Sequence, residues 1–435
     1  MKMNKNLHIP QGYRQTEVGV IPDDWEVVRF DNLRDKNVNH SITGGPFGSN
    51  LKSEHYTKAG VRIIQLQNIG DGLFINKNFI YTDENKAKEL KSCLIYPNDI
   101  ILAKMAEPLA RACIIPDFDP KFLMGSDGIR LHIDANKYNN KFILESINYK
   151  KFRNIAIKRS TGSTRQRIGL NDLKSIPIII PPLKEQQKIA DILTTWDNAI
   201  KQQTRLCEKK QQLKKGLMQQ LLTAKTRFSE FSDDWEIVKL NNIGITYNGL
   251  TKKTAIDFQN GSYKYIAYMN IFSNSKINTL ISDFVQIQLN ENQNKVQYGD
   301  IFFTTSSETP EEVGMSSVLL EDIENTYLNS FCFAYRLNNF DTLLPEFAQF
   351  YFRSFFVRYE ILRLAQGSTR FNISKKEVLK IKILLPSVRE QQKIAQVLTL
   401  ADDEITKLQT ELVLLKIQKK GLMQQLLTGK IRIKI

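Results

Sequence analysis

Two short segments of the chain combine small, hydroxyl-bearing and guanidinium-bearing residues. Gly-Ser-Thr-Arg occurs at residues 162–165 and again at residues 367–370. Loops of this composition present backbone N–H groups, hydroxyls and guanidinium forks together, and these donors bind phosphate oxygens or the edges of nucleic-acid bases. The residues that we predict to make such contacts are Thr164, Arg165, Gln166, Arg167, Thr369, Arg370 and Asn372.

A third segment, Gly-Pro-Phe-Gly-Ser-Asn-Leu-Lys at residues 45–52, offers similar groups. Gly45, Phe47, Ser49 and Lys52 are the candidates there, with backbone N–H groups, a hydroxyl and an ammonium facing phosphate. The alternative is a tight turn with no contact. The Gly-Ser-Thr-Arg loops have an alternative role as caps of a helix junction. Because they are the same in both places, they predict a shared backbone contact or a structural role.

Recognition of particular bases is expected from residues that differ between the two halves of the chain. Arg or Lys with guanine and Asn or Gln with adenine are the usual pairs. The candidates are Lys104, Arg111, Lys252, Lys253, Thr305 and Ser306. The net charge of +15, from 61 Lys and Arg against 46 Asp and Glu, favours a polyanionic partner. A genomic composition rich in Lys, Asn and Ile explains the charge equally well.

We find no residues spaced for catalysis. The chain has no Asn-Pro-Pro-aromatic or Asp-Pro-Pro-aromatic motif, and Gly429-Lys430 lacks the upstream glycine of a phosphate-binding loop. The Pro-Asp-rich segment at residues 116–121 is better explained as a surface turn. The four histidines lack zinc or triad spacing. We therefore expect a protein without catalytic, metal or cofactor sites.

The composition is that of an ordinary globular protein, with 42% hydrophobic and 25% charged residues. The four cysteines show no paired spacing, which argues against a disulfide framework. We find neither a signal peptide nor an apolar run long enough for a membrane span. These features predict a cytoplasmic protein.

The chain contains an internal duplication. Lys-Lys-Gly-Leu-Met-Gln-Gln-Leu-Leu-Thr begins at Lys214 and again at Lys419, 205 residues later (419 − 214). Glu-Gln-Gln-Lys-Ile-Ala at residues 185–190 and 390–395 keeps this offset, and Asp-Asp-Trp-Glu opens each copy at residues 23–26 and 233–236. Between these anchors the halves barely resemble each other. The pattern predicts two similar units that carry two different inserts.

Each copy also predicts a helix of about 40 residues, roughly 60 Å long, after Pro182 or Pro386. Apolar residues of the second helix follow a heptad spacing, interrupted by Lys419. The first helix starts the same way but places Gln203, Cys207, Lys210 and Lys214 on the seam, which suggests that its stripe drifts. The predicted contact residues are Ile189, Leu193, Trp196, Ile200, Leu217, Leu221, Ile394, Leu398, Ile405, Leu408, Leu412, Leu415, Leu422 and Leu426.

The economical arrangement is an antiparallel coiled coil within one chain, because a two-fold relation between the halves would place the globular units at opposite ends. The fold class predicted is α+β with pseudo-two-fold duplication. The segments are 1–20 (N-terminal segment), 21–180 (first domain), 181–228 (first helix), 229–385 (second domain) and 386–435 (second helix). Predicted strands cover residues 61–66, 99–104, 113–116, 128–133, 263–268, 300–305, 315–320 and 332–337.

The repeated Pro-x-x-x-Glu-Gln-x-x-Ile-Ala segments, the repeated Lys-Lys-Gly-Leu-Met-Gln-Gln-Leu-Leu-Thr and the segment at residues 45–52 resemble the specificity subunit of type I restriction-modification systems. The start at residues 12–22, Gly-Tyr-Arg-Gln-Thr-Glu-Val-Gly-Val-Ile-Pro, resembles the usual start of that family, and the likeness covers essentially the whole chain. One departure is that the second insert has Tyr247-Asn248-Gly249 in place of Gly-Pro-Phe-Gly, which leaves equivalent contacts there in doubt.

The resemblance implies a non-catalytic protein in which each insert is a target recognition domain for half of a bipartite DNA site. The helices would set the spacer length and dock partners. It implies two methyltransferase subunits, which carry S-adenosylmethionine, and restriction subunits, which use ATP and Mg²⁺. The rival hypotheses are a coiled-coil scaffold of a complex without DNA, and a fused enzyme with catalytic residues hidden in the inserts.

Overall fold

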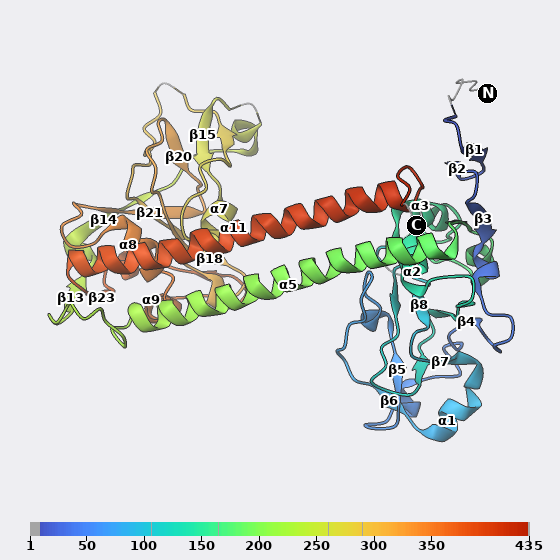
Figure 1. Cartoon of the computed structure of the whole chain (residues 1–435). Helices are drawn as coiled ribbons and strands as arrows, with labels where there is room; N and C mark the ends of the chain where they lie inside the picture. The colour runs from blue at the N-terminus through green and yellow to red at the C-terminus, as the bar shows by residue number, and fades with distance from the viewer. Residues whose placement is uncertain (1–8, 106, 164, 260, 289, 434–435) are drawn as a thin grey trace. The chain divides into compact units, whose positions relative to one another are not determined.

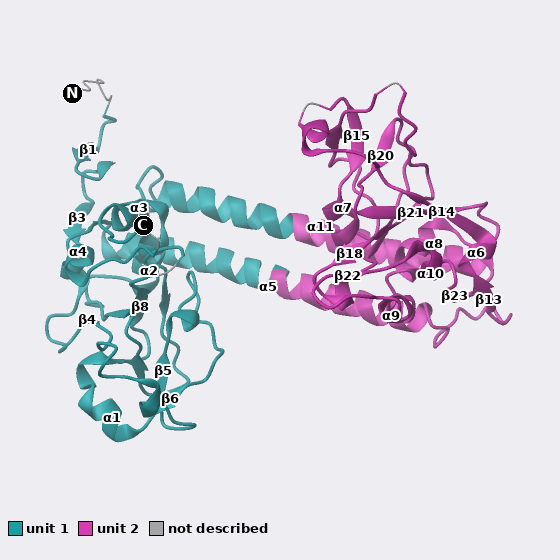
Figure 2. Cartoon of the chain, turned by 180° about the vertical axis from the view of Figure 1, so that it is seen from behind, with its two compact units in different colours: residues 1–203, 411–435 teal, residues 204–410 magenta. Residues whose placement is uncertain are grey.

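The chain forms two compact units. The computed structural model describes residues 9–105, 107–163, 165–259, 261–288 and 290–433. Unit 1 comprises residues 1–203 and 411–435, and unit 2 comprises residues 204–410 (Figure 2). Figure 1 labels the two long helices, α5 (Leu183–Leu221) and α11 (Val388–Leu426). Each contributes one part to unit 1 and the rest to unit 2, as the two colours of Figure 2 show.

Unit 1 is built on two four-stranded sheets. Its strands are β1 Tyr13–Thr16, β2 Gly19–Pro22, β3 Glu26–Arg29, β4 Ile42–Gly44, β5 Val61–Ile64, β6 Tyr81–Thr82, β7 Leu94–Ile95, β8 Ile100–Ala103, β9 Ala112–Ile114, β10 Phe122–Met124, β11 Gly128–Leu131 and β12 Pro177–Ile180. One sheet is antiparallel with the order β4-β11-β8-β9, and the other has the order β6-β5-β10-β7, with β5 and β10 parallel. The short helices are α1 Glu84–Glu89, α2 Asn140–Asn148, α3 Lys150–Lys158 and α4 Leu170–Lys174.

Unit 2 is similar but is built on one four-stranded and one three-stranded sheet. Its strands are β13 Glu236–Lys239, β14 Gly244–Asn248, β15 Tyr263–Ile266, β16 Asp283–Val285, β17 Ile301–Thr304, β18 Ser306–Ser307, β19 Ser316–Val318, β20 Thr326–Leu328, β21 Cys332–Leu337, β22 Phe371–Asn372 and β23 Lys382–Leu385. The sheets have the orders β14-β21-β17-β19 and β16-β15-β20, with β15 and β20 parallel. The helices are α6 Leu240–Ile243, α7 Tyr268–Ser273, α8 Pro345–Tyr351, α9 Phe355–Arg363 and α10 Lys375–Val378.

The eight strands predicted from the sequence are all present, as β5, β8, β9, β11, β15, β17, β19 and β21. The mixed helix and strand content confirms the predicted α+β class. The equivalence of the two inserts extends to single hydrogen bonds. Gly125 N–H donates to Ile64 O over 2.7 Å, and Asn329 N–H donates to Ile266 O over 3.1 Å, at the ends of matching parallel strands.

The two long helices pack antiparallel within each unit. As the residue number rises along α5, the contacted residue number on α11 falls, which confirms the predicted direction. Pairs that show this are Asp197–Lys419 and Gln203–Glu411 in unit 1, and Lys210–Glu404 and Lys214–Asp402 in unit 2.

The heptad seam predicted for α11 is confirmed, because its apolar positions from Ile394 to Leu426 are all buried or half-buried. The drift predicted for α5 is wrong. Cys207 is buried and Lys210 and Lys214 are half-buried, whereas Leu206 and Leu213 are exposed. The heptad register of α5 therefore continues through the middle of the helix, with lysines at some of the seam positions. The lysine stems lie along the seam while their ammonium groups bind acidic residues of α11.

The repeated ten-residue segment forms the end of each long helix. This end is buried in the core that is built mainly by the other copy of the repeat. Leu422, Met423 and Leu426 of α11, and Leu427 directly after it, pack in the core of unit 1, together with Ile189 and Leu193 of α5. In unit 2, Leu217, Met218 and Leu221 of α5, and Leu222 directly after it, pack in the core together with Ile394 and Leu398 of α11. Identical sequences are thus buried in equivalent surroundings, and each unit is completed by the helix that belongs to the other copy.

Two glutamates hold these ends in place. The Trp25 indole N–H donates to Glu185 Oε2 over 3.0 Å, and Arg432 donates to both carboxylate oxygens. In unit 2, the Trp235 indole and Arg227 bind Glu390 in the same way, with a Trp235 distance of 3.2 Å. The repeated Asp-Asp-Trp-Glu and Glu-Gln-Gln motifs are therefore partners in a buried polar contact.

Candidate functional site

Both Gly-Ser-Thr-Arg loops are closed by the same pair of backbone hydrogen bonds. Thr161 and Arg167 exchange N–H···O bonds of 2.9 and 2.9 Å, and Gln366 and Asn372 exchange bonds of 2.9 and 2.8 Å. The loops begin at glycines with φ of +97° and +130°, where a Cβ would lie 2.5 and 2.1 Å from a carbonyl oxygen of the same loop. Only glycine fits this close approach.

The loops project exposed side chains. Arg165, Gln166, Thr369 and Arg370 are exposed, and neither arginine forms an ion pair with the residues that the structure describes. Thr164 was also predicted as a contact residue, but it lies outside the described residues. A closed loop with a free guanidinium suits an anionic partner.

Each loop is attached to the end of a central strand. Ile168 N–H donates to Lys104 O over 3.0 Å in unit 1, and Ile373 N–H donates to Thr305 O over 3.1 Å in unit 2. The same two residues donate to the next loop, from Lys104 N–H to Asp127 O over 2.7 Å and from Thr305 N–H to Phe331 O over 2.9 Å. Lys104, Asp127 and Arg167 therefore occupy the same backbone positions as Thr305, Phe331 and Asn372.

The side chains at these positions differ. In unit 1, Arg167 forms an ion pair with Asp127, and the Lys104 ammonium donates to Ser126 O over 3.2 Å. Burial lowers the pKa of Lys104, and the positive charge of Arg167 lowers it further. In unit 2 the three equivalent side chains carry no charge, and Phe331 is 58% exposed. Neither Asp127 nor Phe331 was predicted from the sequence. They are 40 and 41 residues from Arg167 and Asn372 in the sequence (167 − 127 and 372 − 331), and neither belongs to a recognisable motif.

The segment at residues 45–52 adjoins this site in unit 1. Gly45 N–H donates to Gly128 O over 2.8 Å, and a Cβ on Gly44 would lie 2.7 Å from the Lys104 ammonium nitrogen. Phe47 is 82% exposed, and Ser49 and Lys52 are also exposed. In unit 2, Asn248 and Gly249 take this place, and Asn248 accepts a hydrogen bond from Lys375.

The remaining predicted residues are less accessible or lie apart. Arg111 donates to the carbonyl oxygens of Glu107 and Leu66, at 3.1 and 3.0 Å. The Lys253 side chain is 2% exposed and pairs with Glu291 at 2.5 Å, whereas Lys252 is exposed. Ser306 is buried, with its carbonyl oxygen bound by the Tyr268 hydroxyl. For Arg111, Lys253 and Ser306, contact with a ligand would require present bonds to break or a buried group to become exposed.

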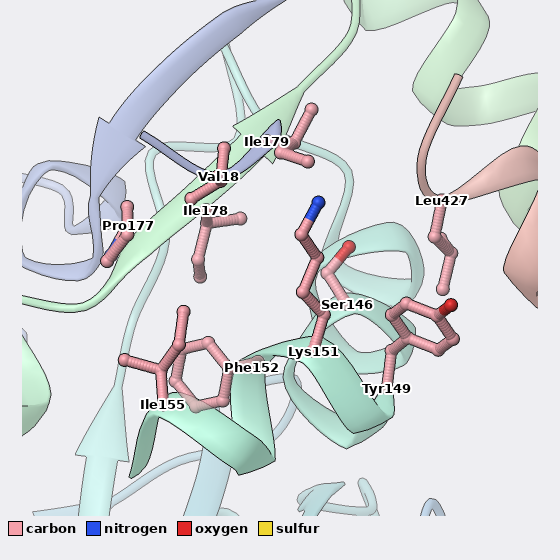
Figure 3. Close-up of a pocket in the computed structure, with 10 residues that line it drawn as sticks. All are labelled: Val18, Ser146, Tyr149, Lys151, Phe152, Ile155, Pro177, Ile178, Ile179 and Leu427. Atoms are coloured by element: carbon pink, nitrogen blue, oxygen red, sulfur yellow. The ribbon is translucent and has the colours of Figure 1, made fainter. Parts of the chain in front are cut away.

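A small cavity in unit 1 lies apart from these loops. The cavity has a volume of about 30 Å³ and is lined mostly by apolar side chains, together with Ser146, Tyr149 and Lys151, whose ammonium points into it (Figure 3). The equivalent of Ser146 in unit 2 is Tyr351, whose hydroxyl donates to Leu384 O and accepts from Leu384 N–H. The cavity is therefore where unit 1 lacks a tyrosine ring.

Within the described part of the chain, no group of three His, Cys, Asp or Glu side chains is placed to hold a metal ion. Over the same part, no helix is long and apolar enough to cross a membrane.

Comparisons with known proteins agree with this organisation. A family model described as type I restriction modification DNA specificity domain matches residues 22–212 and 232–415. A putative type I restriction enzyme MjaX specificity subunit from Methanocaldococcus jannaschii is 26% identical, over 98% of this chain and 97% of the relative. The MjaVIII specificity subunit from the same organism is 24% identical, over 95% and 94%.

Solved structures show the same fold. The type I restriction-modification S subunit from M. genitalium has a TM-score of 0.54 at 19% identity, covering 94% of this chain and 96% of that one. A chain from a study of complex assembly and conformational transition in a type I restriction-modification system has a TM-score of 0.55 at 14% identity, covering 94% and 99%.

Proposed function

The chain belongs to the family of type I restriction-modification DNA specificity subunits, and from this membership we propose that each unit recognises one half of a bipartite, asymmetric DNA site. The observation that carries the proposal is the pair of equivalent sites around Lys104 and Thr305. Their backbone hydrogen bonds match, while their side chains differ. Two domains that share a backbone arrangement at this site but differ in its side chains suit two different half-sites.

The shared features of the two sites suit the DNA backbone. Arg165 and Arg370 occupy the same place in loops of the same conformation, and both are exposed. Phosphates are present at every step of a duplex, so a phosphate contact is expected to be the same in both units. The net charge of +15 would add counterion release to the affinity.

The long helices would set the distance between the half-sites. Each is 39 residues long, about 58 Å at 1.5 Å per residue. Exposed apolar residues lie on the outer face of α11, namely Leu400, Val413, Leu414 and Ile417. We assign this face to the docking of two methyltransferase subunits. In this proposal, restriction subunits complete the complex, and S-adenosylmethionine, ATP and Mg²⁺ act in the partner subunits, which carry all catalysis in the cytoplasm.

Binding to duplex DNA tests the proposal. The purified chain with its methyltransferase partner is expected to bind a duplex that carries the host's bipartite methylated motif, with affinity falling steeply as salt rises. A coiled-coil scaffold unrelated to DNA would show no such salt dependence. Methyl transfer or DNA cleavage by the isolated chain would instead support the fused-enzyme hypothesis.

Methylome sequencing of the host identifies the motif independently. The expected result is an asymmetric motif of two short parts separated by unspecified bases, lost when the gene is deleted. A methylome unchanged by the deletion would contradict the proposal.

A further inference from the structure

Three equivalent positions beside the Gly-Ser-Thr-Arg loops differ in chemical character between the units. We propose that they select one base pair in each half-site, with Arg167 of unit 1 recognising guanine and Asn372 of unit 2 recognising adenine. The inference rests on the proposed function, because it assigns specificity to the DNA contact suggested above. Lys104 and Asp127 assist Arg167, and Thr305 and Phe331 are their counterparts in unit 2.

In unit 1 the geometry favours an acceptor-rich base. The Asp127 carboxylate holds the Arg167 guanidinium through Nη2. That side chain is 51% exposed and forms no other hydrogen bond with the described residues, so donors remain for a ligand. The Lys104 ammonium adds a second positive charge from the adjoining strand end. In the major groove, guanine alone presents two acceptors, N7 and O6, which a guanidinium binds in a bidentate manner.

In unit 2 the same place favours an A·T pair. Asn372 is exposed, and a carboxamide offers one donor group and one acceptor, which match N7 and the amino group of adenine. The Asn372 carboxamide has one long hydrogen bond, of 3.3 Å, to Arg370 O. The exposed Phe331 ring is an apolar surface suited to the methyl group of thymine. No charged side chain occupies these three positions.

A purely structural role does not explain these side chains. The contacts that the two units share at these positions run through backbone N–H and C=O groups, which any residue other than proline supplies, whereas the side-chain contacts differ between the units. A phosphate contact does not explain the difference either, because phosphates are the same in both half-sites. The identical Arg165 and Arg370 fit that role better.

The test uses the full chain in complex with its methyltransferase partner and a pool of duplexes randomised in both half-sites. Arg167→Lys keeps the charge but removes the bidentate fork. It is expected to lower the preference for guanine at one position of one half-site by roughly 5- to 100-fold. Asn372→Ala is expected to lower the preference for adenine at one position of the other half-site. In each case the second half-site should be unchanged.

Arg165→Ala is the matched control, since this variant should weaken binding to every sequence without changing the preferred bases. Equal thermal unfolding of wild type and variants would show that they fold. If Arg167→Lys and Asn372→Ala leave all base preferences unchanged, the inference is overturned while the proposed function stands. A wild-type complex without any sequence preference would instead overturn the proposed function.

Discussion

Single residues of the repeated motifs act through buried polar contacts. Trp25 is fully buried, and its only polar group is bound by Glu185, which also pairs with Arg432. The hydrogen bonds that Arg432 donates to the Glu185 and Asp24 carboxylates raise its pKa above the ordinary value. A carboxylate buried without these partners would be strongly unfavourable. The occurrence of both motifs in each copy is therefore explained by packing, quite apart from DNA.

Glu185→Gln is expected to lower the free energy of unfolding by roughly 1–3 kcal/mol, because Arg432 loses its buried charged partner. The matched control is Glu17→Gln, where a half-exposed carboxylate pairs with Arg29 at 3.0 Å. Its effect should stay below about 1 kcal/mol. Urea unfolding followed by circular dichroism measures both, and equal losses would contradict the buried contact.

At the scale of elements, two lysines occupy equivalent positions in the coiled coil but have different neighbours. Lys214 and Lys419 hold matching positions and pair with Asp402 and Asp197. Lys419 also meets Glu145, which is only 5% exposed. Lys214 instead lies 5.4 Å from the centre of the Phe350 ring, at the place that corresponds to Glu145. The equivalent lysines therefore differ in their contacts, because Lys419 pairs with a buried carboxylate in unit 1 and Lys214 lies over an aromatic ring in unit 2.

This difference predicts unequal effects of the same substitution. Lys419→Met should cost roughly 1–3 kcal/mol, because Lys141 is then the one cation among the described residues that pairs with Glu145 and Asp197. Lys214→Met should cost less than about 0.5 kcal/mol, because methionine keeps the contact with Phe350. Denaturant unfolding of both variants decides the point. Losses of the same size would show that the local surroundings do not matter.

The unit 1 cluster also predicts a pH dependence. Burial alone would raise the pKa of Asp197, but hydrogen bonds from Lys141 and Lys419 outweigh it and lower the pKa. A lowered carboxyl pKa contributes stability above the unfolded value of about 3.9, and this is lost as pH falls through the folded pKa. Asp197→Asn should therefore flatten the decline in unfolding free energy below about pH 4. Urea titrations at several pH values measure this. If the free energy of unfolding fell equally steeply below pH 4 for variant and wild type, the prediction would be refuted.

At the scale of the whole molecule, the proposed function makes the helices a spacer. Gln203 faces Glu411 across the two helices, so both helices can be lengthened at this level without a change of register. Seven residues add about 10 Å to a helix, close to three base pairs at roughly 3.4 Å each.

Insertion of one heptad after Gln203 and one before Glu411 is expected to lengthen the preferred spacer by about three base pairs. Both half-sites should stay the same, since no residue of either loop site changes. Selection from duplexes with varied spacers measures this. A four-residue insertion in each helix serves as the control, since it breaks the heptad register. An unchanged spacer, or altered half-sites, would defeat the spacer proposal.

The sequence by itself determined the duplication, the strands at the centre of each unit and the heptad seam of the second helix, because these follow from repeats and short-range periodicity. It did not reveal that the first helix keeps its register, since the seam lysines there depend on acidic residues of the other helix. Tertiary structure alone decided which residues meet. Asp127 lies beside Arg167, and Phe331 holds the matching place in unit 2, because backbone hydrogen bonds attach two separate loops of each unit to the end of the same strand. Such contacts are set by the packing of whole elements, and no local pattern in the chain encodes them.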